Sequence, residues 1–195
     1  QPSAALPTAT DEASWAGANW PLGAHYDAAA SATTFTVAAP DATRVRLEVY
    51  ARATGAEPNA TAHHPRGHDA RAHARRGEVG PGAHYGYRVW GPGWEVDAAW
   101  HPGSAAGFVR DLCPRGNRFN PNKVLFDPYA REVTHNVFTD QLHEYGVNDG
   151  VFGTGGDLVD GVPRRNIDTG PYAPKGVLIA DYTPVTPKPR IPSEK

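Results

Sequence analysis

Two short segments in which polar and apolar residues alternate set the strongest limits on the fold of this chain. In residues 44–50 the alternation is almost perfect, so Val45, Leu47 and Val49 would share one face of a strand. Residues 33–37 alternate in the same way and end before a Pro-Asp turn signal. We expect these two segments to be hairpin partners, with one face buried and the other in solvent.

Three further segments have the composition of strands. Residues 85–90 carry bulky side chains at both odd and even positions, so on both faces of a strand, which is typical of a central strand covered on both sides. Residues 107–109 and 177–179 are shorter apolar runs. The 21 glycines and 19 prolines favour many short elements joined by turns over long helices. The sequence therefore predicts an all-β fold, specifically a β-sandwich.

Residues 117–130 have a more specific pattern of turn, short strand and turn. Asn120 precedes a proline, which disfavours the helical region for Asn120, and the side chains of Asn120 and Asn122 can bond nearby backbone groups. Residues 124–126 form an apolar run of strand length. Asp127 and the proline after it are typical of the N-cap and first position of a brief helical turn.

Together with residues 85–92 and 172–179, the segment 117–130 resembles the N-terminal region of isoamylases and bacterial glycogen debranching enzymes. The similarity runs from about residue 21 to about residue 179. It implies an immunoglobulin-like β-sandwich, often classed as a carbohydrate-binding module, placed ahead of a barrel that hydrolyses α-1,6-glucosidic bonds. The structural motif that carries the resemblance includes Tyr87, Arg88, Trp90, Asn120, Asn122, Asp127 and Tyr129.

The resemblance implies a role without catalysis for this chain. A glycoside hydrolase barrel needs about 250 residues of alternating strand and helix, and the reaction needs paired carboxylates on that scaffold. We therefore expect a non-catalytic N-terminal module of an isoamylase-type debranching enzyme of glycogen and starch metabolism. Its partners would be the catalytic barrel of the same polypeptide and α-glucan. An autonomous glycogen- or starch-binding module is the alternative.

The predicted organisation has four parts. Residues 1–20 lack apolar periodicity and are expected to form a tail, and residues 21–130 are expected to form the sandwich. Residues 131–181 contain scattered Gly, Asp and Asn and predict a long irregular extension with a final strand near 177–179. Residues 182–195 are rich in proline and predict an extended linker.

Aromatic side chains have two expected roles. Trp94, Trp100 and His101 lie in a loop rich in glycine and proline, where exposed rings could stack on sugars or pack against the absent barrel. The aromatic residues on predicted strands are expected in the core instead. These are Tyr85, Tyr87, Trp90 and Phe126.

A stretch rich in histidine and arginine, residues 58–76, shows no strand pattern. A solvated loop, a zinc site and an erroneous or frame-shifted stretch of sequence are the three interpretations. The zinc site would use His63, His68 and His73 with Asp69, but tetrahedral zinc sites need ligands on rigid elements. The loop is the preferred interpretation.

We expect no cofactor in the chain itself. The resemblance implies a calcium ion between this region and the barrel in some family members, with a ligand at the position of Asn136. An amide oxygen can bind calcium without contributing charge. The remaining ligands would come from the missing domain, so the site would be incomplete here.

The triplet Asp168-Thr169-Gly170 matches the aspartic-protease motif. That chemistry needs two carboxylates that share a proton, so a single copy would require a homodimer. An aspartic-protease-like dimer is therefore a remote alternative.

The net charge of −2 offers no field that would recruit nucleic acid or an anionic membrane, so neither is an expected partner. The sequence starts at Gln1, contains no methionine and has a single cysteine. Removal of a signal peptide would explain the missing initiator, so a secreted or periplasmic location is expected, with the cytoplasm as the alternative.

Overall fold

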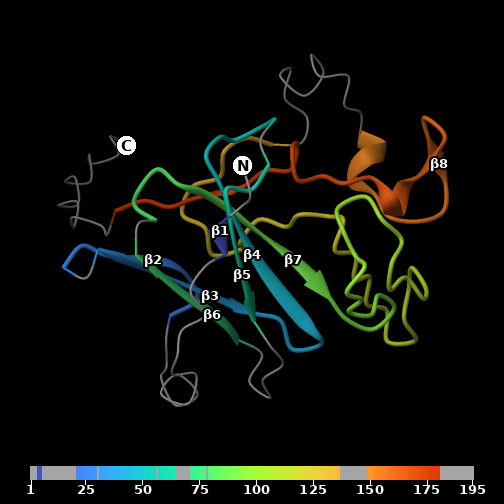
Figure 1. The fold of residues 1–195 in the computed structure, drawn as a ribbon, viewed down its shortest axis with the longest axis horizontal. Helices are drawn as coiled ribbons and strands as arrows, with labels where there is room; N and C mark the ends of the chain where they lie inside the picture. Colours follow the sequence, from blue (N-terminus) through green and yellow to red (C-terminus); the bar gives the residue numbers. More distant parts are fainter. Residues whose placement is uncertain are drawn as a thin grey trace, which may run out of the picture.

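The computed structural model describes residues 4–5, 21–29, 31–55, 57–64, 71–77, 79–136 and 149–180. Two sheets form the body of the molecule (Figure 1). The larger sheet has, in spatial order, the strands β1 (Ala4–Ala5), β5 (Ala60–His64), β4 (Arg44–Tyr50), β7 (His84–Trp90) and β10 (Gly176–Val177). The smaller sheet has the order β2 (Gly23–Asp27), β3 (Ala32–Ala38) and β6 (Arg71–Gly77).

The remaining elements lie late in the chain. A small hairpin joins β8 (Leu158–Val159) to β9 (Val162–Pro163), flanked by the 3-10 helices η1 (Asp149–Phe152) and η2 (Arg164–Asn166). The two turn residues Asp160 and Gly161 have φ values of 49° and 79°, as a two-residue hairpin turn requires. No α-helix occurs in the part of the chain that the structure describes, and no helix there could cross a membrane.

The hydrophobic core lies between the two sheets. Val45, Leu47 and Val49 of β4 are buried in it, as their alternation predicts. From the smaller sheet, the ring of Phe35 meets the ring of Tyr85 edge to face, with the centroids 5.1 Å apart. The all-β sandwich fold is thus confirmed.

The expected hairpin between residues 33–37 and 44–50 is wrong, although both segments are strands. β3 pairs with β2 and β6, whereas β4 pairs with β5 and β7 in the other sheet. The second face of β4 is not in solvent either, because Glu48 and Tyr50 are 0% and 1% exposed. Alternation locates a strand but does not choose its pairing partner.

β7 is the central strand that its composition predicts. It pairs with β4 along one edge and with β10 along the other, and Tyr85, Tyr87, Arg88 and Trp90 are all buried. The core placement of Tyr85, Tyr87 and Trp90 is confirmed.

The expectation of a loop for residues 58–76 is wrong. The backbone there forms β5 and most of β6, each paired along its length with a strand that has a clear pattern, β4 or β3. Pairing therefore overrides a weak local preference. His63 and His73 lie in different sheets, whereas His68 and Asp69 lie outside the described residues.

Three predicted strands are shorter in the structure. Residues 124–126 are reduced to one bridge, between Leu125 and Tyr87, and residues 107–109 to one between Phe108 and Trp94. The last strand is β10, which is centred slightly before residues 177–179. Phe126 is 48% exposed, so its predicted place in the core is wrong.

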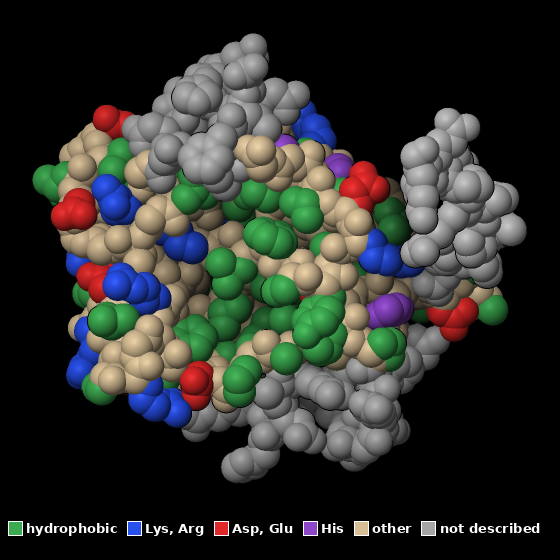
Figure 2. Space-filling model, turned by 180° about the vertical axis from the view of Figure 1, so that it is seen from behind, with side chains coloured by type: hydrophobic (Ala, Val, Ile, Leu, Met, Phe, Trp, Pro, Cys, Tyr) green, Lys and Arg blue, Asp and Glu red, His purple; other side chains and the backbone are tan. Residues whose placement is uncertain are grey.

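Irregular segments cover the outer face of the larger sheet, which explains why β4 and β7 are buried on both sides. The covering segments fall within residues 91–127 and 149–175, which bond to outward-facing side chains of these strands and to each other. Seen from behind, the molecule has hydrophobic side chains gathered in the middle of one face and most charged side chains nearer its border (Figure 2).

Candidate functional site: a buried polar network beneath an exposed apolar segment

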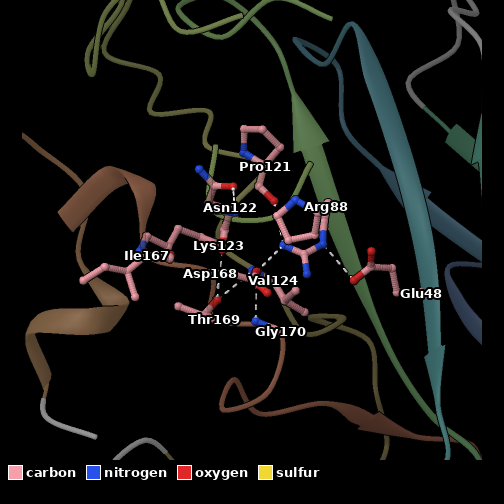
Figure 3. Close-up of polar contacts among 12 residues, drawn as sticks. Glu48, Arg88, Pro121, Asn122, Lys123, Val124, Ile167, Asp168, Thr169 and Gly170 are labelled. Carbon is pink, nitrogen blue, oxygen red and sulfur yellow. Dashed lines mark hydrogen bonds and ion pairs between the residues drawn. The ribbon is translucent and has the colours of Figure 1, made fainter. Parts of the chain in front are cut away.

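The covering segments within residues 91–127 and 149–175, which we call the irregular cover, are tied to the sheet by Arg88. It points outward from β7, and its side chain is 0% exposed. Its Nε donates to Glu48 Oε2 at 2.8 Å, while Nη1 donates to the carbonyl oxygen of Pro121 at 2.9 Å and to Asp168 Oδ1 at 2.6 Å (Figure 3). One guanidinium therefore joins β4, the segment after Asn120 and the segment before Gly170.

The charges of this network compensate one another. Burial by itself lowers the pKa of the Arg88 guanidinium, but the carboxylates of Glu48 and Asp168 outweigh that effect and raise it above the ordinary value. Glu48 also lies 3.2 Å from Arg46 Nε and accepts a bond from the hydroxyl of Tyr50 at 2.6 Å. Burial, followed by the Glu48 charge, raises the pKa of Tyr50, so this hydroxyl stays a donor.

Asn120 and Asn122 organise the loops around this network, as predicted for residues that flank a proline turn. Asn120 Oδ1 accepts from the backbone N–H of Asn122 at 2.9 Å, which closes an Asx turn. Asn122 Oδ1 accepts from the N–H of Gly103 at 2.9 Å, and its Nδ2 donates to the carbonyls of Ser104 and Arg165. Each buried amide is thus bonded to backbone groups of other loops.

Two buried lysines, which sequence reasoning did not single out, complete the site. Lys123 Nζ donates to the carbonyl oxygens of Val151, Arg164 and Ile167 at 2.7, 2.8 and 2.7 Å. Burial lowers the pKa of Lys123 to about 8. No sequence signal distinguishes this lysine from an exposed one, because its three acceptors are backbone groups at least 28 residues away.

Lys175 has a similar environment on the same face of the sheet. Its Nζ donates to the carbonyls of Ala53 and Ala173 at 2.9 and 3.0 Å and lies 4.4 Å from the centroid of the Tyr50 ring. Burial lowers its pKa also to about 8, against the effect of the Glu48 charge.

Gly86 allows the segment at Val124 and Leu125 to approach β7 closely. A Cβ atom on Gly86 would be 2.6 Å from Val124 Cγ1 and 3.1 Å from the carbonyl oxygen of Leu125. Without that atom, Leu125 exchanges both backbone hydrogen bonds with Tyr87, at 2.8 and 2.9 Å. The backbone at Leu125 is therefore fixed while its side chain stays outside.

The chain then turns at Asp127, but the helical turn expected there is a β-turn closed by the N–H of Ala130 and the carbonyl oxygen of Asp127, so the predicted helix N-cap is wrong. Asp127 Oδ1 accepts from the N–H of Tyr129 at 2.8 Å, and Oδ2 accepts from the hydroxyl of Tyr85 at 3.0 Å. The carboxylate is 1% exposed, and burial raises its pKa. Asp127 is buried, whereas the large apolar residues Leu125, Phe126 and Tyr129 around it are exposed.

These neighbours form what we call the apolar segment: Leu125, Phe126, Tyr129 and Val133. Their exposed fractions are 51%, 48%, 56% and 39%. Phe126 was predicted to lie in the core, and Tyr129 was assigned to the structural motif. The structure buries the other motif residues, Tyr87, Arg88, Trp90, Asn120, Asn122 and Asp127, and leaves Tyr129 exposed.

The predicted sugar-binding residues are not presented together. Trp94 is 1% exposed, its indole N–H donates to the carbonyl of Ala106 at 2.8 Å, and its ring packs against Phe108. A buried ring cannot stack on a sugar, so that expectation is wrong for Trp94. Trp100 is half-buried against Trp90, with the centroids 4.9 Å apart, and His101 is exposed.

Asp168 does not have the environment of an aspartic-protease carboxylate. Its Oδ1 is paired with the buried Arg88 and also accepts from the N–H of Gly170 at 3.2 Å. A carboxylate held by a guanidinium is not poised to share a proton with a second carboxylate. Asn136 is exposed, and no cluster of metal-binding side chains occurs among the residues that the structure describes.

Comparison with known proteins gives this arrangement a family context. The chain is 39% identical over 172 residues to the isoamylase of Pseudomonas amyloderamosa, which covers 85% of this chain and 21% of that enzyme. It is 39% identical over 182 residues to an isoamylase of a Flavobacterium species, which covers 86% of this chain and 22% of that enzyme. A glycogen debranching enzyme of Erwinia tasmaniensis is 36% identical over 103 residues, or 53% of this chain and 11% of that enzyme.

No protein-family model matches the chain. Among solved structures, the catalytic module of the pneumococcal glycogen-degrading virulence factor SpuA is 14% identical with a TM-score of 0.43, covering 83% of this chain and 16% of that one. The sequence relatives show that this chain is a homologue of part of the isoamylases and bacterial glycogen debranching enzymes, and it spans about a fifth of an isoamylase.

Proposed function

We propose that this chain is a non-catalytic, N-terminal module of an isoamylase-type debranching glycoside hydrolase and supports a catalytic barrel in the same polypeptide. The observation that carries the proposal is the match itself. The match covers 85% of this chain but only 21% of an isoamylase, so most of the isoamylase sequence lies outside the matched region. The substrate would be the α-1,6-branched glucan that such enzymes debranch.

The chemistry of the buried carboxylates supports a structural role. Glycoside hydrolysis uses two carboxyl groups about 5–10 Å apart that face the scissile bond. Here Glu48 and Asp168 neutralise Arg88, and Asp127 caps a turn beneath Tyr85. These three groups stabilise the fold in positions where a glucan would not reach them.

Contact with α-glucan has a weaker basis. Trp94 is buried, which leaves the half-buried Trp100 and the exposed His101 from the predicted set. We therefore place support of the barrel first and do not propose an autonomous binding module.

The test replaces the matching region of the Pseudomonas isoamylase by this chain. Release of reducing ends from amylopectin is compared for the parent enzyme, the enzyme without that region, the chimera and this chain alone. We expect activity from the parent and the chimera, and none from the chain alone or the deletion. Activity of this chain by itself, or a chimera no more active than the deletion, would contradict the proposal.

A further inference from the structure

We propose that the apolar segment, Leu125, Phe126, Tyr129 and Val133, is the surface on which the remainder of the longer polypeptide docks. This inference rests on the proposed function and adds to it the surface that makes the contact. Four large apolar side chains within nine residues are each at least 39% exposed. Contiguous exposed apolar side chains mark interaction surfaces in soluble proteins, and closeness along the chain favours such a surface here.

The backbone beneath the segment is fixed, which favours a preformed docking surface over a loose loop. Leu125 exchanges two hydrogen bonds with Tyr87, and the N–H of Tyr129 is held by Asp127. At the far end, Val133 forms a bridge with Gly176, and the N–H of Val177 donates to the carbonyl of Glu132 at 2.9 Å. Side chains on an ordered backbone lose less entropy on binding.

The core holds the segment from within. Val124 and Asp127 are 6% and 1% exposed, and Ala130 packs against the core cluster. Buried and exposed residues therefore follow one another along a single strip, so turning the exposed ones into the core would displace Val124 and break the bond between Asp127 and Tyr85.

A second exposed apolar pair, Leu158 and Val162, serves as the comparison. These residues are 67% and 42% exposed. They belong to a hairpin of two-residue strands closed by a tight turn, with a small satellite cluster behind it instead of the main core. We expect this pair to stay in solvent.

The occupant follows from the length of the relatives. About four fifths of an isoamylase lies outside the match with this chain. A permanent neighbour in the same polypeptide needs an apolar contact surface that is always available, and this is what four fixed apolar side chains offer.

The experiment measures how fast a cysteine placed in the segment reacts with a maleimide. F126C is compared with the control L158C, in the free chain and in the isoamylase chimera, by mass spectrometry of the labelled peptides. Native Cys113 is 4% exposed, so its labelling rate gives the background reaction of a buried thiol. Because labelling of a covered thiol requires local opening, we expect F126C to react at least about tenfold more slowly in the chimera than in the free chain. L158C should react equally fast in both.

The outcomes separate docking from the proposed function. An active chimera in which F126C stays as reactive as in the free chain overturns docking at this surface but leaves the proposed function standing. An inactive chimera contradicts the proposed function, whatever the labelling. In the free chain, protection of F126C that rises with protein concentration would assign the surface to a second copy, and protection by maltohexaose would assign it to glucan. Either result overturns the inference.

Discussion

At the scale of single residues, two arginines make ion pairs of the same length in opposite surroundings. Arg88 lies 2.8 Å from Glu48 with both side chains 0% exposed, and Arg115 lies 2.8 Å from Asp41 with side chains 67% and 35% exposed. Removing one member of a buried pair leaves a charge without compensation, whereas water replaces a partner at the surface. The two sites therefore allow a matched comparison.

We expect Arg88→Ala to lower the free energy of unfolding by about 3–5 kcal/mol, because it leaves Glu48 and the Pro121 carbonyl buried with fewer partners. Arg115→Ala should change it by less than about 1 kcal/mol. Urea unfolding followed by tryptophan fluorescence measures both. Losses of similar size would show that the Arg88 network contributes little.

The two buried lysines predict a dependence of stability on pH. In the folded chain the pKa of Lys123 is about 8, against an ordinary value of 10.5. Between these values the unfolded chain binds more protons, so the free energy of unfolding should rise with pH, by at most about 1.4 kcal/mol per pH unit for this group. Below pH 8 both states are protonated and the contribution no longer changes.

The comparison of the parent chain with Lys123→Met isolates this effect. As the pH rises from 8 to 10, the unfolding free energy of the parent should increase relative to that of Lys123→Met. Urea titrations at several pH values supply the numbers. A difference that is flat over that range would mean that Lys123 keeps its ordinary pKa, and one that shifts toward the variant would mean that its pKa is raised; either result contradicts the prediction.

At the scale of elements, alternation predicted β3 and β4, and bulk on both faces predicted β7, but neither pattern predicted how the strands are arranged. The pattern of residues 44–50 depends only on which side chains face the core, so it is compatible with pairing to β3 or to β5 and β7. Residues 60–64 and 71–77 have almost no pattern and are strands because β4 and β3 supply their hydrogen bonds. Local sequence could not reveal that.

The site was predictable in part for the same reason. The bonds of the Asn120 and Asp127 side chains to backbone N–H groups two residues further on are local, and such bonds were predicted at both positions. The contacts of Arg88 with Asp168 and of Lys175 with Ala53 join residues 80 and 122 positions apart. Such contacts follow from tertiary packing alone.

Contact between elements also predicts the effect of a methyl group on β7. We expect Gly86→Ala to destabilise the chain by about 1–3 kcal/mol, because its Cβ would overlap Val124 and displace the cover. Gly80→Ala is the control, since its Cβ would meet nothing within 4 Å. Thermal unfolding compares the two variants. Equal stability would show that the segment at Val124 lies farther from β7 than in this structure.

At the scale of the whole molecule, the irregular cover adds a third layer to the two sheets. Arg88, Asn122 and Lys123 fix that layer from inside through backbone acceptors, and the apolar segment begins where the layer leaves β7 and is exposed. The chain is thus organised as a rigid support, and its proposed contribution to a debranching enzyme is stability and position. In the same proposal, the reaction chemistry would belong to the rest of the polypeptide.

The most direct measurement of this claim is the unfolding temperature of the module, alone and within the isoamylase chimera. Hydrogen exchange of β7 peptides along a temperature ramp reports on the module without interference from the other domains. Docking stabilises the folded state, so we predict that β7 stays protected to a higher temperature in the chimera, and that Phe126→Ser removes most of this gain while Leu158→Ser does not. Loss of protection at the same temperature in the chimera and the free chain would contradict the account.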